Sequence, residues 1–301
     1  SRLVMRVALA GGAGFVGAHT RRRLRAAGHH VAVIDRDGPP ATAEEGAWIV
    51  EDLCTEGAGA RAAAACGGVD AVVWLAASIR RSRRPDDDVP ADLRLAAGAP
   101  LEFLHALSPP PASLVFMSSI QVYGDPRRLP VDEEHPTEPV TSYGVAKLCG
   151  EQMLAIACRR LGVRCVSLRA SFVYGRGQHP GNVIPVFLRE LRGGRPPVVF
   201  GDGREVRDDV HVTDVARAVE GALSGGAEGA FNIASGRPRT LLDVAEAACR
   251  ISGTGLRPVV RAGAGGWVDR WFSIDRARRE LPWEPTIDLD EGLRGVWEPP
   301  A

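Results

Sequence analysis

A tyrosine and a lysine four residues apart, Tyr143 and Lys147, are the residues of this chain whose types and spacing most directly suggest chemistry. Lys147 is the only lysine among 37 lysine and arginine residues, so arginine supplies positive charge everywhere else. Arginine stays protonated, whereas lysine is a compact ammonium whose pKa responds to its surroundings. On a helix the two side chains share a face. The pair is suited to making a phenol act as an acid or base near neutral pH; the alternative is a surface lysine without a role.

A glycine-rich segment near the N-terminus follows a short apolar stretch, residues 6–11, that is predicted to be a buried strand. Gly12, Gly14 and Gly17 form the pattern G-x-G-x-x-G, and a helical segment then runs to about residue 27. Asp35 ends a second predicted strand, 31–35, and lies 18 residues after Gly17. Strand, glycine-rich turn, helix and acid in this order indicate a dinucleotide site, with the pyrophosphate at the helix N-terminus.

The acid at the end of the second strand bears on which dinucleotide binds. A carboxylate at Asp35 would accept hydrogen bonds from the adenosine ribose and repel a 2′-phosphate, which favours NAD over NADP. The neighbouring Arg36 leaves NADP open, because a guanidinium could hold that phosphate. A glycine-rich turn without a ligand is the alternative.

Alternating strands and helices continue along the chain and predict an α/β fold built on a parallel sheet. Further strands are expected at 48–53, 70–77 and 113–119, and helices near 55–66, 91–107 and 143–161. Ligands of such sheets bind beyond the carboxyl ends of the strands. Asp35, Asp52, Ala76, Ala77 and Ser119 all fall at such ends, so these residues are expected to converge on one crevice.

The overall composition excludes several classes of protein. The formal net charge is zero, which argues against general nucleic-acid binding, and no stretch of 18 apolar residues could span a membrane. The six cysteines are scattered without a CxxC pair, and the seven histidines show no ligand spacing, so no metal site is expected. With no signal peptide at its start, the sequence is expected to be cytoplasmic.

Ser119 ends a predicted strand 24 residues before Tyr143, where its hydroxyl could hydrogen-bond a substrate oxygen. Together with Tyr143, Lys147 and the glycine-rich segment, it gives the pattern of short-chain dehydrogenases/reductases. The whole chain resembles their extended branch, the nucleotide-sugar epimerase/dehydratase family. The matching segments cover nearly its full length and lie at 11–17, 52–53, 75–77, 118–124, 143–151, 168–175, 201–214, 231–236 and 277–293.

The resemblance implies an enzyme that uses NAD, or NADP, on a nucleotide-diphosphate sugar. Tyr143 as phenolate would take a hydroxyl proton while the sugar C4 gives hydride to nicotinamide. Lys147 would lower the tyrosine pKa and bind the nicotinamide ribose, and Ser119 would orient the oxygen. The implied cofactor-binding residues are Gly11, Gly14, Phe15, Val16, Gly17, Asp35, Arg36, Asp52, Leu53, Leu75, Ala76, Ala77, Tyr143 and Lys147.

The implied substrate site comprises Ser78, Ser119, Ile120, Gln121, Tyr143, Phe172 and Arg207. Arg207 would bind the diphosphate; its alternative is a surface ion pair with Asp208 or Asp209. The basic loop 80–84 reads either as an anion pocket or as a solvated loop balanced by the acids at 86–88.

The chain departs from the family pattern at several positions. Ile120 and Gln121 stand where many dehydratases of the family have an acidic pair, so 4,6-dehydration is not expected. Phe172 replaces an asparagine that contacts the substrate phosphates, and Leu95 replaces a helix asparagine. The apolar Phe172 suits a deoxysugar, as in deoxysugar biosynthesis.

The resemblance further implies a dinucleotide-binding Rossmann-type domain over residues 1–170. A smaller C-terminal α/β substrate-binding lobe over 171–301 is expected to be interleaved with it. Wide apolar helix faces near 91–107 and 143–161 suggest a homodimer, as in the family. The leading hypothesis is an NAD-dependent nucleotide-sugar 4-epimerase, and the second is an NAD(P)H-dependent 4-keto-6-deoxysugar reductase.

Overall fold

The computed structural model describes residues 4–39, 46–77, 89–263 and 268–298. Its largest element is a seven-stranded parallel sheet in the order β11-β6-β5-β4-β1-β2-β3. The strands are β1 Arg6–Ala10, β2 His30–Asp35, β3 Trp48–Val50, β4 Ala71–Trp74, β5 Ser113–Ser119, β6 Arg164–Ala170 and β11 Gly229–Ile233. The predicted Rossmann-type parallel sheet is confirmed.

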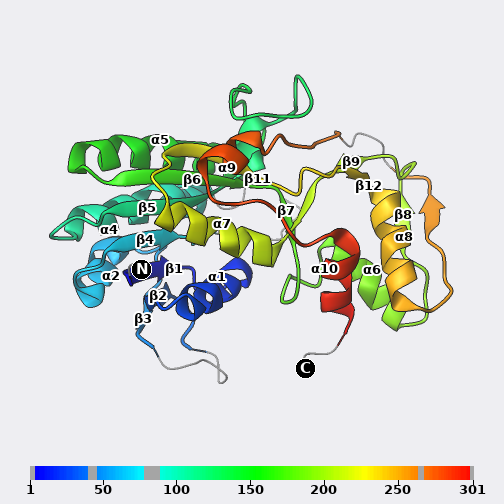
Figure 1. Cartoon of the computed structure of the whole chain (residues 1–301), viewed down its shortest axis with the longest axis horizontal. Helices are drawn as coiled ribbons and strands as arrows, with labels where there is room; N and C mark the ends of the chain where they lie inside the picture. The colour runs from blue at the N-terminus through cyan, green and yellow to red at the C-terminus, as the bar shows by residue number, and fades with distance from the viewer. Residues whose placement is uncertain (1–3, 40–45, 78–88, 264–267, 299–301) are drawn as a thin grey trace.

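Helices cover both faces of this sheet, as Figure 1 shows. Side chains alternate along each strand, so Val7 and Leu9 of β1 belong to one core and Ala8 and Ala10 to the other. The first core includes side chains of α1 Phe15–Ala26 and α7 Val212–Ser224. The second includes side chains of α2 Ala58–Cys66, α4 Ala99–Ala106 and α5 Ser142–Leu161. The near-continuous apolar strands follow from this two-sided burial.

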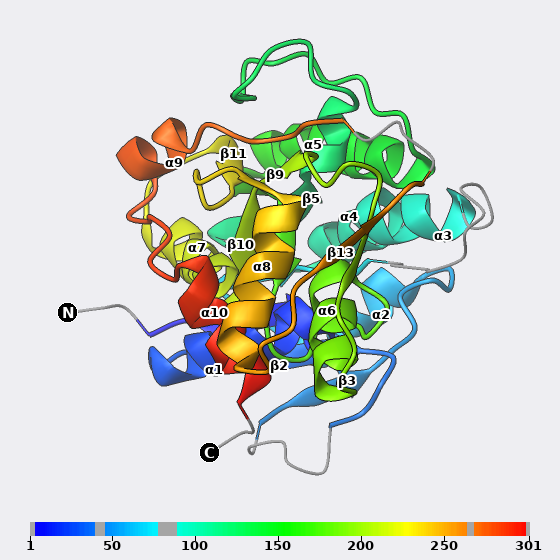
Figure 2. The ribbon, with the colours of Figure 1, turned by 90° about the vertical axis from the view of Figure 1, so that its right-hand side faces the viewer.

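The rest of the chain builds a smaller α/β lobe with a core of its own (Figure 2). Helices α6 Val183–Arg192, α8 Leu241–Ser252 and α10 Leu289–Trp297 pack side by side there. Three strand pairs accompany them: β7 Phe172–Tyr174 with β10 Asp209–His211, β8 Val198–Phe200 with β13 Val259–Arg261, and β9 Val206–Arg207 with β12 Arg239–Thr240. Helix α9 Asp275–Glu280 lies against β11.

Several elements differ from the sequence-based expectation, among them β4, which ends at Trp74 rather than at residue 77. The third strand ends at Val50 rather than at residue 53, because Asp52 starts a turn in which Cys54 donates its N–H to Asp52 Oδ1 at 3.0 Å. The helix expected over 91–107 is divided into α3 Val89–Leu93, a π-helical turn η1 Arg94–Gly98, and α4. Pro100 explains this break, since it has no N–H to donate to the carbonyl four residues earlier.

No helix among the described segments has the length and apolar character needed to cross a lipid bilayer.

Candidate active site

The glycine-rich turn after β1 packs so closely that a Cβ atom at two of its glycines would clash with the backbone. Gly11 has φ of +81°, and a Cβ there would lie 2.7 Å from the backbone nitrogen of Ala76, which follows β4. A Cβ at Gly17 would collide with the carbonyl oxygen of Gly11 and lie 2.7 Å from the Cα of Gly12. The glycines therefore bring the turn, the start of α1 and the end of β4 into close contact, as the sequence pattern predicts.

The N-terminus of α1 is open to an anion. Its N-cap, Gly14, makes no side-chain capping bond, and its first turn, which begins with Phe15 and Val16, holds no acid. The first N–H groups of the helix and the positive end of its dipole are therefore available to a bound anion. Asp35 ends β2 beside this turn and accepts a 2.9 Å hydrogen bond from the N–H of Ala13. Arg36 is exposed next to it. The arrangement fits a dinucleotide, with pyrophosphate on the helix and ribose at Asp35.

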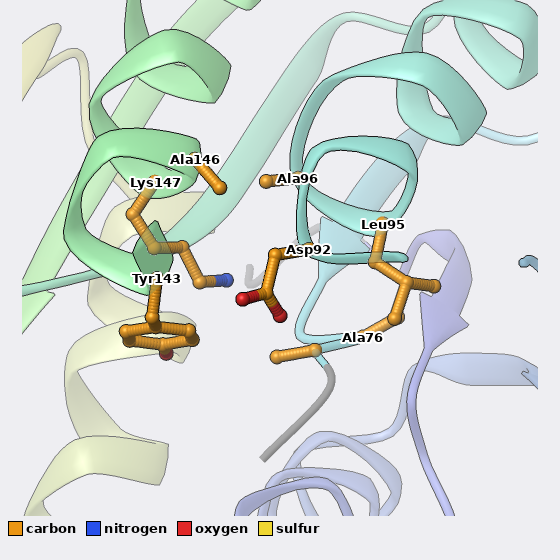
Figure 3. A pocket seen from close by; sticks show the side chains of 8 residues that line it. Ala76, Asp92, Leu95, Ala96, Tyr143, Ala146 and Lys147 are labelled. Carbon is orange, nitrogen blue, oxygen red and sulfur yellow. The ribbon is translucent and has the colours of Figure 1, made fainter. Parts of the chain in front are cut away.

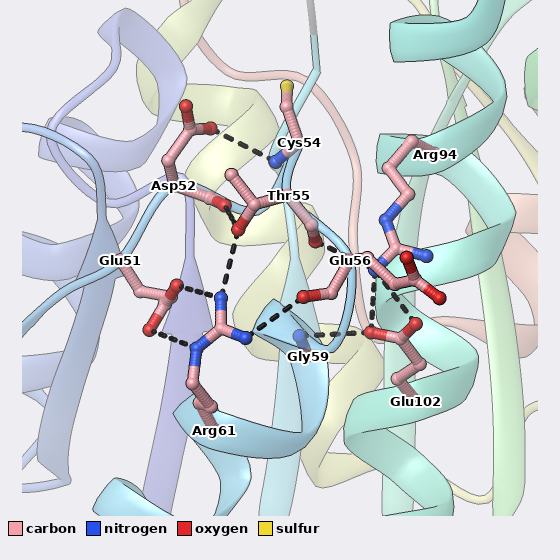
Figure 4. Close-up of polar contacts among 9 residues, drawn as sticks. All are labelled: Glu51, Asp52, Cys54, Thr55, Glu56, Gly59, Arg61, Arg94 and Glu102. Atoms are coloured by element: carbon pink, nitrogen blue, oxygen red, sulfur yellow. Dashed lines mark hydrogen bonds and ion pairs between the residues drawn. The ribbon is translucent and has the colours of Figure 1, made fainter.

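The turn after β3 is held to the neighbouring helices by arginines (Figure 4). Arg61 pairs with Glu51 at 2.7 Å, and Arg94 of η1 pairs with Glu102 at 2.7 Å while donating to the carbonyl of Thr55, also at 2.7 Å. The two predicted cofactor residues of this turn lie in different surroundings. Asp52 is exposed, whereas the Leu53 side chain is buried in the core beneath α2.

The start of α5 lies directly against the 3-10 turn η2 Ile120–Tyr123, which follows Ser119. Thr141 caps α5 by accepting the N–H of Gly144 at 3.0 Å and donates to Gln121 Oε1 at 2.7 Å. A Cβ at Gly144 would lie 2.5 Å from the carbonyl oxygen of Gln121. Close packing of these two segments brings the predicted catalytic residues Ser119 and Tyr143 to the same edge of the sheet.

Lys147 is buried one turn further along α5, with a side chain only 2% exposed. Its Nζ donates a 2.8 Å hydrogen bond to the carbonyl of Met117 in β5. The ammonium lies 4.8 Å from the ring centroid of Phe116 and 5.6 Å from that of Tyr143. The predicted i, i+4 pair therefore shares one face of the helix and one pocket.

This pocket is narrow, and Figure 3 shows a carboxylate facing the lysine across it. The carboxylate belongs to Asp92 of α3, which the sequence analysis did not single out. A signal was available, since Asp92 lies three and four residues before the buried Leu95 and Ala96 and so shares their inward face. The full lining is Ala76, Ala77, Asp92, Leu95, Ala96, Tyr143, Ala146 and Lys147.

Burial and the Asp92 charge set the protonation of the pair. Burial lowers the pKa of Lys147 to about 8, against the opposing attraction of Asp92 and Glu151. Burial, and then Asp92, raise the pKa of the Tyr143 hydroxyl above its ordinary value. Burial and the nearby carboxylate both favour the neutral phenol, so the net pKa of Tyr143 is raised; that Lys147 acts to lower it stays a prediction.

The predicted substrate residues lie in two places. Ile120 and Gln121 are in η2, beside Ser119, whereas Phe172 and Arg207 are in the strands of the second lobe. Ser78 and the basic loop 80–84 lie outside the described residues.

Arg207 forms the ion pair that the sequence left as an alternative. Its guanidinium lies 3.1 Å from the carboxylate of Asp209 and stacks over Phe172 with 4.2 Å between the guanidinium carbon and the ring centroid. The pair is largely buried rather than on the surface, with side-chain exposures of 15% and 7%. Burial raises the pKa of Asp209, and Arg207 opposes that shift. Within the described segments, Arg207 Nε is a buried donor without a partner.

Two further motif residues prove to be structural. Arg169 forms a bidentate, buried ion pair with Glu151 at 3.0 and 2.7 Å and donates to the hydroxyl of Tyr123 at 2.9 Å. Tyr123 donates in turn to Asn232 at 2.6 Å and is 1% exposed, so it is part of the core. The described residues contain no group of histidines, cysteines and acids arranged for a metal ion.

Comparison with known proteins shows the family to which this chain belongs. A family model described as "NAD dependent epimerase/dehydratase family" matches residues 7–234. The chain is 32% identical to UDP-glucose 4-epimerase of Azospirillum brasilense, over 97% of this chain and 95% of that protein. It is 36% identical to a putative UDP-glucose 4-epimerase of Methanocaldococcus jannaschii over a shorter stretch, 61% of either chain.

A solved structure with the same fold is that of UDP-glucose 4-epimerase from Thermotoga maritima with UDP-glucose. It superimposes with a TM-score of 0.85 and 28% identity, covering 97% of each chain.

Proposed function

Because the chain belongs to the NAD-dependent epimerase/dehydratase family, we propose that it is a nucleotide-sugar 4-epimerase that keeps NAD bound and reuses it. The observation that carries this proposal is the position of Tyr143 and Lys147 on one face of α5, at the same sheet edge as the glycine cradle of α1. NAD, when bound, would accept a hydride from the sugar C4 and return it. Asp35 supports NAD over NADP, since its carboxylate would repel a 2′-phosphate.

The chain's own residues would manage the proton of the sugar hydroxyl. Tyr143 would take this proton during oxidation and give it back during reduction, and Ser119 would hold the same oxygen by a hydrogen bond. Lys147 would hold the cofactor ribose with its ammonium. Arg207 would hold the substrate diphosphate in the second lobe.

A 4,6-dehydratase reaction is not proposed, because the two residues after Ser119 cannot transfer protons. Ile120 is apolar and 6% exposed, and the Gln121 amide accepts from Thr141.

The second candidate is a nucleotide-4-keto-6-deoxysugar reductase. Ser119, Tyr143 and Lys147 would serve the same half-reaction in it, and the apolar Phe172, which lies over the Arg207 guanidinium at 4.2 Å, is the feature that suits such a substrate. Phe172 supports a deoxysugar in either case. The two candidates differ in whether the cofactor is recycled in place or consumed.

The deciding experiment is to denature freshly purified protein and identify the released dinucleotide by mass spectrometry. About one NAD per chain supports the epimerase, whereas an empty site or NADP supports the reductase. Tyr143→Phe tests the chemistry shared by both. Turnover should fall by roughly 10²–10⁴-fold with substrate binding retained. Turnover within a few-fold of the native value would contradict both assignments.

We also propose that the chain forms a homodimer through α3 and α5. Apolar side chains are exposed on α5 at Val145, Met153 and Ile156 (49%, 43% and 46%) and on α3 at Val89 and Leu93. The two helices pack together, so the side chains can form one apolar surface, which a second copy would cover.

A further inference from the structure

The pocket around Lys147 contains an acid as well as the tyrosine and lysine of the proposed mechanism. Asp92 extends from α3 toward the ammonium of Lys147 on α5, and Figure 3 shows the two charged groups pointing at one another. Apart from these two residues and Tyr143, the lining consists of alanines and Leu95. A ligand entering here therefore meets one cationic donor, one anionic acceptor and one hydroxyl, all against apolar walls.

The charges within reach of Lys147 come from two elements. Asp92 on α3 and Glu151 on α5 both act on the ammonium. Glu151 is committed to the bidentate ion pair with Arg169 at 2.7 and 3.0 Å, within the buried network beneath α5. Among the described acids that act on Lys147, Asp92 is the one that lines the pocket.

We infer that Asp92 is a binding residue for the second ribose of the dinucleotide, accepting hydrogen bonds from the diol to which Lys147 donates. The inference rests on the proposed dinucleotide site. A ribose diol both donates and accepts hydrogen bonds, so a facing carboxylate and ammonium satisfy it from two sides. A phosphate would be repelled by the carboxylate, and an apolar group would form no hydrogen bond with either charged group.

Each ribose of the dinucleotide would then be bound by a carboxylate, at either end of the cofactor crevice. Asp35 ends β2 near the α1 turn, and Asp92 lies near Ala76 and Ala77, which follow β4 and line the same pocket. The pocket is narrow, so a ribose can lie between the carboxylate and the ammonium only if these two groups move apart.

The test compares two ligands that differ by the second ribose: ADP, and ADP-ribose, which carries it. Titration calorimetry is carried out on the full chain, stripped of bound nucleotide on charcoal, and on Asp92→Asn. The native chain should bind ADP-ribose more tightly than ADP. Asp92→Asn should weaken ADP-ribose binding about ten-fold or more, the size expected for a lost hydrogen bond to a charged group, and leave ADP binding unchanged.

Asp35→Asn is the matched control, because the adenosine ribose is present in both ligands. It should weaken ADP and ADP-ribose to the same extent. Equal affinity of the native chain for the two ligands would overturn the inference, and this measurement needs no variant. Equal weakening of both ligands by Asp92→Asn would also overturn it. Failure of the native chain to bind either ligand would instead contradict the proposed dinucleotide site.

Discussion

Arg207 and Asp209 lie two residues apart along the chain and form a largely buried ion pair, with 3.1 Å between guanidinium nitrogen and carboxylate oxygen. Phe172 covers one face of the guanidinium. The arginine proposed to bind the substrate diphosphate therefore already has an anionic partner. An arriving diphosphate must compete with this carboxylate, so Asp209 is expected to limit substrate affinity.

Replacing Asp209 with asparagine should strengthen binding of UDP by about ten-fold, because it removes a negative charge close to the phosphate site. Titration calorimetry measures the affinity. Asp125→Asn is the control, since Asp125 pairs with Arg270 at 2.7 Å on the exposed surface. UDP affinity that is unchanged in Asp209→Asn would show that Arg207 does not contact the diphosphate.

Replacing Lys147 with methionine should stabilise the protein near neutral pH. The pKa of Lys147 is lowered to about 8 from an ordinary 10.5, so the folded state holds fewer protons than the unfolded state between these values. The native free energy of unfolding therefore carries a penalty that is complete below pH 8 and decreases as the pH rises toward 10.5. Lys147→Met removes this penalty, which has an upper bound of roughly 3 kcal/mol. Loss of the bond to Met117 reduces the gain.

Urea denaturation of both proteins from pH 7 to 9.5 measures this effect, below the range in which Tyr143 titrates. The stability difference should be largest at pH 7 and shrink above pH 8. A difference that is constant across this range would mean that the pKa of Lys147 is not lowered.

Gly150 lets α5 approach η1, and its replacement by alanine should destabilise the fold. A Cβ there would lie 2.8 Å from Phe116 Cζ and collide with the carbonyl oxygen of Ala96. Gly295 in α10 is the matched helical control, because a Cβ there meets nothing within 4 Å. Urea denaturation should show that Gly295→Ala gains about 0.5–1 kcal/mol and that Gly150→Ala loses stability. Similar gains in both variants would contradict the close packing.

The proposed dimer should dissociate when a charge is placed on its apolar surface. Ile156→Arg adds a cation to the exposed face of α5, and burying it against a second copy would be unfavourable. Sedimentation velocity should show a native dimer and a monomeric variant. Val260→Arg is the control, since Val260 is equally exposed, at 46%, but lies in the second lobe. A native protein that sediments as a monomer would contradict the proposed dimer.

Five strands of the parallel sheet were predicted, because each is an apolar run that ends in a turn or an acid, whereas β6 and β11 were not predicted as strands. Ser113–Ser119 was predicted to the residue, since its burial is continuous. The π-helical turn was harder to predict, because periodicity around Leu95 suggests a continuous helix and only Pro100 marks the break. Sequence spacing also placed Tyr143 and Lys147 on one helical face.

The direction of the pKa shifts of that pair could not be predicted, because they depend first on burial and then on an acid from another element. Asp92 is 51 residues before Tyr143 and follows an acidic run, 86–88, that makes it look like surface charge. Only the packing of α3 against α5 turns it toward Lys147. The Arg207–Asp209 pair was recognised as an alternative, but its burial depends on the folding of the second lobe.

A chain with one lysine side chain, and that one buried, has a consequence for covalent labelling. Acylating reagents attack the neutral amine of a lysine, and here the only such side chain is Lys147, 2% exposed. Its lowered pKa makes the neutral form more abundant than in an ordinary lysine, yet at 2% exposure it can react only when the surrounding side chains move. The rate of acylation at this single position would therefore report how often the crevice opens, without a reporter group being introduced.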